Sequence, residues 1–213
     1  NDGISRINIK LKSIDGTEIN GQGPHIDSSH IEQLMNRLRR LESGDVLVLA
    51  GSIPAGISDN IYKDIMDMLK DKGVQIVVDA TSRLLTNVLE YNPFFIKPNQ
   101  HELGDIFNVT LNTQEEVIPY ALELKKMGAV NVCVSMGGKG AILVADDGNV
   151  YKAKAPDGIL KNSVGAGDSL VAGFLSGWIE KKDYEYAFRK GVATGSASAF
   201  SERLATNGEV NDL

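Results

Sequence analysis

The chain has 213 residues, a formal net charge of -6 and a hydrophobic content of 42%. This composition is typical of one large globular domain, and the acidic balance without a dense run of Lys or Arg excludes a surface for nucleic acid or for an anionic membrane. No apolar run approaches the roughly 20 residues of a membrane span, so we expect no membrane partner and a cytoplasmic protein.

The first predicted element is a β-hairpin. Apolar and polar residues alternate over residues 7–11, Asp15-Gly16 supplies a tight turn, and residues 17–20 can return as the partner strand. A capping box at residues 29–32 then predicts the start of a helix that continues to residue 41.

The centre of the chain alternates between strand and helix patterns. The apolar run Val46–Ala50 is typical of a parallel strand covered on both faces. The elements that follow are helix 59–72, strand 74–79, helix 84–90, strand 94–97, a helix from about 99, helix 114–127 and strand 130–135. This alternation predicts a doubly wound, mostly parallel α/β sheet flanked by helices.

The last elements are an antiparallel hairpin over residues 140–154 at one margin of the sheet, a helix after Gly165 and a helix over residues 184–200. Ligands of such sheets bind beyond the carboxyl ends of the strands. The segments that follow those ends are Gly51-Ser52, Asp79, Lys97 to Asn99 and Ser135 to Gly140. We expect these segments to converge on one crevice.

Residues 162–169, Asn-Ser-Val-Gly-Ala-Gly-Asp-Ser, set a flexible turn against the start of a long apolar helix. Gly165 and Gly167 lack a Cβ, so their backbone can approach a ligand closely, and the N–H groups at a helix N-terminus suit the oxygens of a phosphoryl group. Asp168 would then be placed to accept a hydroxyl proton. Taken alone, the same residues also fit an ordinary turn followed by an acidic first helical turn.

A second glycine-rich segment joins two predicted strands. Gly137, Gly138 and Gly140 occupy three of four positions, which we interpret as a backbone cradle for phosphates; the alternative is a mobile hairpin loop. The sequence contains neither G-x-x-x-x-G-K-[ST] nor G-x-G-x-x-G, which excludes a P-loop enzyme and a Rossmann dehydrogenase.

Lys97, Asn99 and Glu102 come directly after a predicted strand. Lys97 could neutralise phosphate charge, and Asn99 with Glu102 could hold magnesium-bound water, because Mg²⁺ keeps several waters and few protein ligands. Asn99 and Glu102 also have the spacing of a capping box, and both interpretations can hold together. The three histidines lack metal-ligand spacing, and the single cysteine, Cys133, lies in an apolar run, so we assign no zinc site, disulfide or thiol nucleophile.

Four motifs together resemble the ribokinase-like PfkB family of ATP-dependent sugar kinases. They are Ala50-Gly51-Ser52-Ile53-Pro54-Ala55-Gly56, Ile96-Lys97-Pro98-Asn99 with Glu102, Val134-Ser135-Met136-Gly137 with Gly140-Ala141, and Ser163 to Ser169. The resemblance covers essentially the whole chain, and within the family the motifs look most like the bacterial 1-phosphofructokinases. It implies transfer of the ATP γ-phosphate to fructose 1-phosphate, with Mg²⁺ as metal cofactor.

The resemblance also implies a role for individual residues. Asp168 matches the catalytic base and lies beside the sugar, and three residues match the anion hole: Gly165, Ala166 and Gly167. The positions on the ATP side are Lys97, Asn99, Ser135, Met136, Gly137, Gly138, Lys139, Gly140, Gly167, Val192 and Ser196, of which the last two would line the adenine pocket. Glu102 and Asn99 match the magnesium side. Arg6 and Ser52 match positions near the phosphate that the substrate already carries.

The resemblance divides the chain at residue 22. Residues 1–22 match a remnant of the family's β lid with its entry strands, and residues 23–213 match the α/β nucleotide-binding core. The family has roughly a further third of chain upstream, and this chain starts at Asn1 without an initiator Met, so we expect a fragment. Because the lid is the family's dimer surface, we expect a homodimer at full length.

Three alternatives to this function remain open at this point. The first is the same chemistry on tagatose 6-phosphate or fructose 6-phosphate. The second is a non-catalytic phosphosugar-binding protein, and the third is a plain α/β domain whose glycines only form turns.

Overall fold

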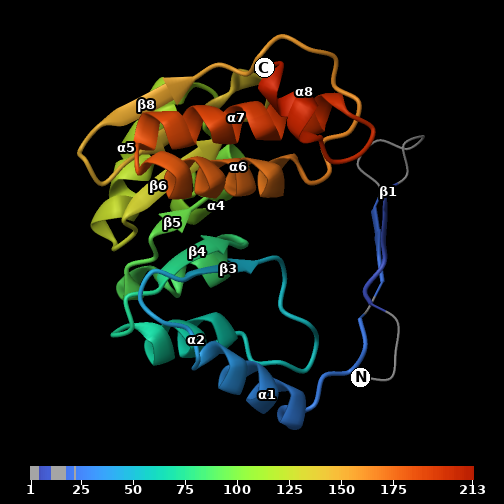
Figure 1. Ribbon diagram of the computed structural model, residues 1–213, viewed down its shortest axis with the longest axis vertical. Coiled ribbons are helices and arrows are strands. Elements are labelled where there is room, and N and C mark those ends of the chain that lie inside the picture. The colour runs from blue at the N-terminus through green and yellow to red at the C-terminus, as the bar shows by residue number, and fades with distance from the viewer. Residues whose placement is uncertain (1–4, 11–17, 22) are drawn as a thin grey trace.

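The computed structural model describes residues 5–10, 18–21 and 23–213. Strands β1 (Asn8–Lys10) and β2 (Glu18–Asn20) form a separate antiparallel ribbon in which Ile9 pairs with Ile19. The ribbon lies beside the main body of the molecule (Figure 1). The predicted hairpin is thus confirmed for its two strands, whereas the predicted turn at Asp15-Gly16 lies outside the described residues.

The main sheet has six strands in the order β3-β4-β5-β6-β7-β8. Their bounds are β3 (Val46–Ala50), β4 (Gln75–Asp79), β5 (Phe95–Ile96), β6 (Asn131–Ser135), β7 (Ala141–Val144) and β8 (Val150–Ala153). Strands β3 to β6 run parallel, and β7 and β8 add an antiparallel hairpin at one edge. The predicted mostly parallel sheet with a marginal hairpin is confirmed.

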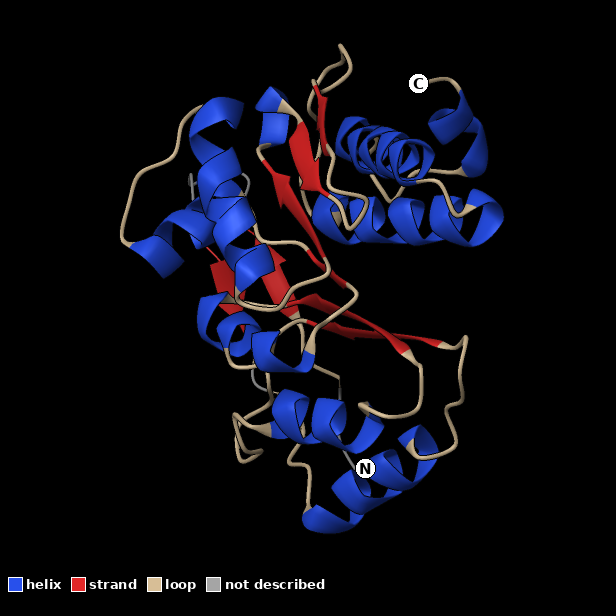
Figure 2. Cartoon of the chain, turned by 90° about the vertical axis from the view of Figure 1, so that its left-hand side faces the viewer, coloured by secondary structure: helices blue, strands red, loops and turns tan. Residues whose placement is uncertain are grey.

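Helices cover both faces of this sheet (Figure 2). They are α1 (Ser28–Leu38), α2 (Ile61–Leu69), α3 (Ser82–Thr86), α4 (Gln100–Phe107), α5 (Gln114–Lys126), α6 (Ala166–Lys181), α7 (Tyr184–Phe200) and α8 (Asn207–Asn211). Short 3-10 turns occupy Leu89–Tyr91 and Gly137–Lys139. None of the described helices combines the length and the apolar character that crossing a bilayer requires.

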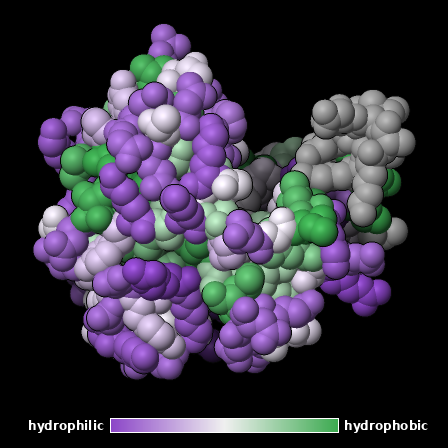
Figure 3. Space-filling view, turned by 90° about the horizontal axis from the view of Figure 1, so that it is seen from above, coloured by the Kyte–Doolittle hydropathy of each residue, from purple (hydrophilic) through white to green (hydrophobic). Residues whose placement is uncertain are grey.

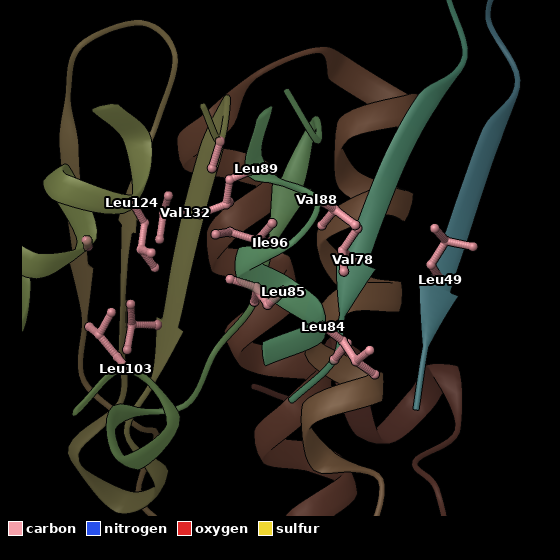
Figure 4. Close-up of a cluster of buried hydrophobic side chains, with 14 of the residues drawn as sticks. Leu49, Val78, Leu84, Leu85, Val88, Leu89, Ile96, Leu103, Leu124 and Val132 are labelled. Carbon is pink, nitrogen blue, oxygen red and sulfur yellow. The ribbon is translucent and has the colours of Figure 1, made fainter. Parts of the chain in front are cut away.

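Alternate side chains along the strands belong to two separate hydrophobic cores. On one face, Val78, Ile96 and Val132 pack with Leu85 of α3 and Leu103 of α4 (Figure 4). Because side chains along a strand alternate between faces, each neighbouring residue contributes to the opposite core. The double covering therefore follows from nearly continuous apolar strands.

The second core lies under α6 and α7. Phe95 of β5 stacks on Phe174 of α6 with ring centroids 4.1 Å apart, and Val77 and Phe188 belong to the same cluster. Cys133 is fully buried here as a free thiol, which confirms its prediction as a small core residue. Burial raises the pKa of the Cys133 thiol to about 12.

The helices differ from the sequence predictions in several places, and the predicted helix 84–90 is α3 (Ser82–Thr86) followed by the 3-10 turn Leu89–Tyr91. The first helix begins after Asp27, whose carboxylate accepts a hydrogen bond from the His30 amide at 3.1 Å, so the predicted capping box starting at Ser29 is wrong. The carboxylate of Asp27, two residues before Ser29, caps the helix instead. Helix α8, which was not predicted from the sequence, starts with a capping box between Thr206 and Glu209.

Strand β3 departs from the prediction that both its faces are covered. Val48 is 44% exposed, whereas Val77, its partner on β4 and on the same face, is fully buried. The cluster under α6 and α7 reaches Val46 at the start of β3 and does not continue along the strand. A cavity of about 500 Å³ also lies beside β3, lined by side chains of α1 and α2. Seen from above, apolar side chains show in the hollow between the main body and the ribbon (Figure 3).

Candidate active site

The N-terminus of α6 forms the first part of the site. Gly165 is the N-cap and has a left-handed backbone with φ 78°, which favours glycine. The first hydrogen bond of the helix runs from the Ser169 amide to the Gly165 carbonyl at 2.8 Å, so the amides of Gly167 and Asp168 precede the helical ladder. Asp168 is exposed in this first turn. The corner is thus open to solvent, as an anion hole beside a base requires.

Lys97 reaches this turn from the end of β5. Its side chain is almost completely buried, and its Nζ lies 3.2 Å from Oδ1 of Asp79. A Cβ built on Gly167 would lie 3.1 Å from the same Nζ. The ammonium therefore lies close to the backbone of the α6 N-terminus, where a Cβ at position 167 would crowd it.

Asp79 is a site residue to which the sequence analysis assigned no role. Burial raises the pKa of Asp79, the Lys97 ammonium opposes that shift, and the charges of Asp168 and Glu102 add to it. Three charged side chains, Lys97, Glu102 and Asp168, thus act on the Asp79 carboxylate. They come from the end of β5, from α4 and from α6. The sequence feature that could have identified Asp79 as a site residue is its position at the carboxyl end of a predicted strand.

Tyr62 of α2 also approaches this end of the sheet. Its hydroxyl donates to the Ala50 carbonyl at 2.9 Å. Burial and the Asp79 carboxylate raise the pKa of Tyr62. The contact ties α2 to the carboxyl end of β3, where Ser52 follows.

Asn99 and Glu102 form the capping box that the sequence allows. Oδ1 of Asn99 accepts from the Glu102 amide at 2.9 Å, and Oε2 of Glu102 accepts from the Asn99 amide at 2.8 Å. Asn99 also pairs with Ser135 in a parallel bridge. The structural interpretation is therefore confirmed, and the box lies beside the loop that follows β6. Across the described ranges, no three His, Cys, Asp or Glu side chains gather as metal ligands would.

The glycine-rich loop after β6 is a closed turn. The Met136 amide donates to the Gly140 carbonyl at 2.8 Å, and the Gly140 amide donates to the Gly137 carbonyl at 2.9 Å. A Cβ on Gly137 or Gly138 would meet no atom within 4 Å, so both border open space. A Cβ on Gly140 would lie 2.0 Å from the Ala153 carbonyl oxygen, so this glycine is needed for packing against β8.

The side chains of this loop point away from the open space. Met136 is 5% exposed and packs in the first core, so only its main chain is available to a nucleotide. Lys139 donates from Nζ to the Asn112 carbonyl at 2.8 Å, and Gln114 donates to the Lys139 carbonyl at 2.9 Å. These bonds connect the loop to the segment that precedes α5 and to the start of that helix.

The two residues predicted for the adenine pocket lie on α7. Val192 is buried in the second core, and Ser196, one turn further, is half-buried. The side chain of Val192 thus packs between helices.

Arg6 and Ser52 are 46 positions apart and meet in space. The Arg6 guanidinium donates to the Ser52 hydroxyl, and its Nε donates to Oδ1 of Asn8 at 2.9 Å. Both Arg6 and Ser52 are exposed. Figure 1 shows the ribbon, whose first strand begins two residues after Arg6, on the same side of the molecule as the carboxyl end of β3 and the N-terminus of α6. The structure therefore brings together the two residues predicted for the substrate phosphate.

The chain is similar in sequence to known carbohydrate kinases. A family model described as pfkB family carbohydrate kinase matches residues 2–209. A 1-phosphofructokinase of Bacillus subtilis (strain 168) is 46% identical over 211 residues, which are 99% of this chain and 69% of that protein. A D-tagatose-1-phosphate kinase of Bacillus licheniformis is 33% identical over 213 residues, which are 100% of this chain and 69% of that protein.

A solved structure has the same fold. Phosphofructokinase-2 from Escherichia coli, in complex with fructose-6-phosphate, superposes with a TM-score of 0.84 at 27% identity. The match covers 97% of this chain and 68% of that chain. The chain therefore spans about two thirds of the length of these relatives.

Proposed function

The chain belongs to the pfkB family of carbohydrate kinases, and from this premise we propose that it transfers the γ-phosphoryl group of ATP to the 6-hydroxyl of fructose 1-phosphate. The observation that carries the proposal is the contact between the Lys97 ammonium and Gly167, one residue before the exposed Asp168. An ammonium and the positive end of a helix meet there beside a carboxylate. Phosphoryl transfer to an alcohol needs this combination of charges.

Asp168 acts as the base in this mechanism. Its carboxylate accepts the proton of the sugar hydroxyl while the hydroxyl oxygen bonds to the γ-phosphorus and the bond from that phosphorus to the β–γ bridging oxygen breaks. The amides of Gly167 and Asp168, with the Lys97 ammonium, stabilise the charge on the transferred group. Because such transition states are loose, positioning and charge neutralisation provide most of the acceleration, and a carboxylate of ordinary basicity is sufficient.

The residues present fit ATP as the phosphoryl donor that sugar kinases of this family use. Gly137 and Gly138 border open space in which polyphosphate oxygens can approach the main chain. Lys97 binds the phosphate that is transferred. Ser196 lies on the adenine side, and Val192 supports that side from within the core.

Asn99 and Glu102 fit the second sphere of a magnesium ion. Oε2 of Glu102 accepts from the Asn99 amide in the capping box, and carboxylates are acceptors that also suit metal-bound water. The charge of Glu102 acts on Asp79, which supports a position facing the centre of the site. When bound, Mg²⁺ supplies positive charge to the phosphate oxygens.

Arg6 and Ser52 bind the phosphate that the sugar already carries. Their mutual hydrogen bond supports a shared target, and a guanidinium matches the geometry of phosphate oxygens. The 46% identity to a 1-phosphofructokinase favours fructose 1-phosphate. The 33% identity to a D-tagatose-1-phosphate kinase makes a tagatose phosphate the second candidate.

Residues 1–22 are part of a β lid, and residues 23–213 are the nucleotide-binding core of a longer domain that forms a homodimer through its lids. Two observations support this division. The apolar side chains of Ile7, Ile9 and Ile19 on the ribbon are 59%, 48% and 54% exposed. In addition, β3 has a neighbouring strand on one side only among the described residues, so its outer edge is available to further chain.

A substrate panel tests the proposed function. Purified full-length protein is supplied with ATP and magnesium, and ADP release is measured with fructose 1-phosphate, tagatose 1-phosphate, tagatose 6-phosphate and fructose 6-phosphate. We expect the largest kcat/KM for fructose 1-phosphate. ATP that raises the melting temperature without ADP release on any sugar would instead indicate a non-catalytic binding protein.

A further inference from the structure

Asp79 ends β4 beside Lys97 and has no part so far in the proposed phosphoryl transfer. Its Oδ1 lies 3.2 Å from Nζ of Lys97, and the two side chains are only 15% and 7% exposed. The carbonyl of Asp79 accepts from the Gly51 amide at 3.0 Å, which fixes the end of the strand. The carboxylate is thus in contact with the ammonium and belongs to a residue whose main chain is bonded to Gly51.

The position of Lys97 is unfavourable without such a partner. Its Nζ is buried against Gly167, at the positive end of α6. Burying an ammonium costs free energy, and the charge of the helix end adds to this cost. A carboxylate in contact with Nζ offsets both effects, because opposite charges attract strongly away from water.

Stability of the fold does not explain the pair. Replacement of a buried ion pair by apolar residues of similar size is often neutral or stabilising. Burial and the nearby charges of Asp168 and Glu102 raise the pKa of Asp79, so its charged form is itself kept at a cost. Buried groups of this kind cluster at functional sites, where their charge serves the chemistry.

We propose that Asp79 is a positioning residue whose carboxylate holds the Lys97 ammonium in place against the first turn of α6. The inference rests on the proposed function, because it gives the ammonium a phosphoryl group to stabilise. Asp79 touches Lys97 and acts through it. Its removal therefore matters only while Lys97 is present.

A double-mutant cycle tests this dependence in the full-length protein. The variants are Asp79→Asn, Lys97→Met and the double variant, each assayed for kcat and for the KM of ATP. We expect Asp79→Asn to lower kcat/KM for ATP by about 10- to 100-fold in the wild-type background and by less than about threefold in the Lys97→Met background. Equal losses in the two backgrounds, or wild-type kcat/KM in Asp79→Asn, would overturn the proposal.

Two further variants keep the cycle interpretable. Asp67→Asn removes the carboxylate of an exposed pair with Lys70 and controls for loss of an acidic charge, with no change in kcat/KM expected. If Asp79→Asn does not fold, Asp79→Glu takes its place, because it keeps the charge and moves the carboxylate by one methylene. Its loss of kcat/KM is likewise expected to disappear in the Lys97→Met background, and a loss that persists there contradicts the proposal.

The dissociation constant of a non-hydrolysable ATP analogue, measured by calorimetry, separates the positioning role of Asp79 from the proposed kinase function. Failure of the wild-type protein to phosphorylate any sugar contradicts the proposed function. The same double-mutant cycle, measured as the dissociation constant of the analogue, still tests the positioning role of Asp79. It needs no sugar, because the proposed contact of Lys97 is with the nucleotide. Weaker binding in Asp79→Asn that depends on Lys97 supports the positioning role, and binding equal to wild type in Asp79→Asn opposes it.

Discussion

The two ends of the candidate site are held in different ways. At the phosphoryl end, Lys97 and Asp79 are buried side chains that contact each other and the start of α6. At the sugar end, Arg6 and Ser52 are exposed and meet through a hydrogen bond between a thin ribbon and a loop. Groups that stabilise developing charge are thus fixed by the cores, whereas groups that recognise the substrate lie on elements with little packing.

Loss of the Asp168 carboxylate is the largest effect that this comparison predicts. Asp168→Asn keeps the size of the side chain and removes the base, so we expect kcat to fall by about two to four orders of magnitude with little change in the KM of ATP. Steady-state ADP release at saturating sugar measures the change. Asp64→Asn is the matched control, because Asp64 is also an acidic residue in the first turn of a helix. Normal turnover in Asp168→Asn would contradict the assignment.

Two glycines of the phosphate loop separate packing from binding. Gly140→Ala places a Cβ 2.0 Å from the Ala153 carbonyl oxygen at a residue with φ 89°. We expect a loss of about 3 kcal/mol or more in the free energy of unfolding. Gly138→Ala enters open space, so its stability should change by less than about 0.5 kcal/mol while ATP binds more weakly. Denaturant unfolding and calorimetry measure the two effects, and equal destabilisation by both would contradict this distinction.

Two paired valines compare the covered and uncovered parts of the same sheet face. Val77 on β4 is fully buried under α6 and α7, and Val48, opposite it on β3, is 44% exposed. Val77→Ala removes buried methyl groups and leaves a cavity, which should cost about 2 kcal/mol. Val48→Ala should cost less than about 0.5 kcal/mol in the 213-residue chain. A larger cost for Val48→Ala in a longer chain than in this one would show that upstream residues cover β3.

This contrast also shows what sequence patterns could predict. The apolar run of β3 indicates a parallel strand correctly, but coverage depends on which helices reach the edge, and that is a tertiary property. Likewise Asn99 and Glu102 have a spacing that predicts their capping box, because the contact is local. Asp79 had no such local signal, since its partner Lys97 comes from a neighbouring strand.

At the sugar end, the contact of Arg6 with Ser52 follows from the family resemblance rather than from any pattern around Arg6. An isolated arginine just before a short strand is typical of a solvated residue. The register of the ribbon and the loop after β3 together bring the guanidinium to the hydroxyl. Long-range placement of this kind needs the folded chain.

Removal of the Arg6 guanidinium should affect substrate binding more than chemistry. Arg6→Ala loses a charge-assisted contact to a phosphate that does not react, so the KM of the phosphosugar should rise about tenfold or more with a smaller change in kcat. Arg39→Ala, which removes an exposed arginine bonded to Asn36, is the control. A fall in kcat for Arg6→Ala as large as that for Asp168→Asn would contradict the division into a sugar-recognising end and a phosphoryl-transfer end.

The smallest effect concerns the thiol beneath the phosphoryl end. Cys133 is fully buried and its pKa is raised to about 12, with Lys97 and Asp79 as the charges that act on it. The folded protein thus binds the thiol proton more tightly than the unfolded chain. This contribution to stability is complete below the ordinary value of 9.0 and is lost as the pH rises from there toward about 12.

At pH 8 we therefore expect a thiol reagent to modify Cys133 only through transient opening. The rate should be about a thousandfold or more below that of the denatured protein. Absorbance of the released thiolate measures both rates, and the denatured chain supplies the control because it contains one cysteine. Activity should be unchanged while the thiol stays unmodified. Rapid labelling of the folded protein would mean that the layer under Lys97 opens readily, and the phosphoryl end would then be no more rigid than the ribbon that carries Arg6.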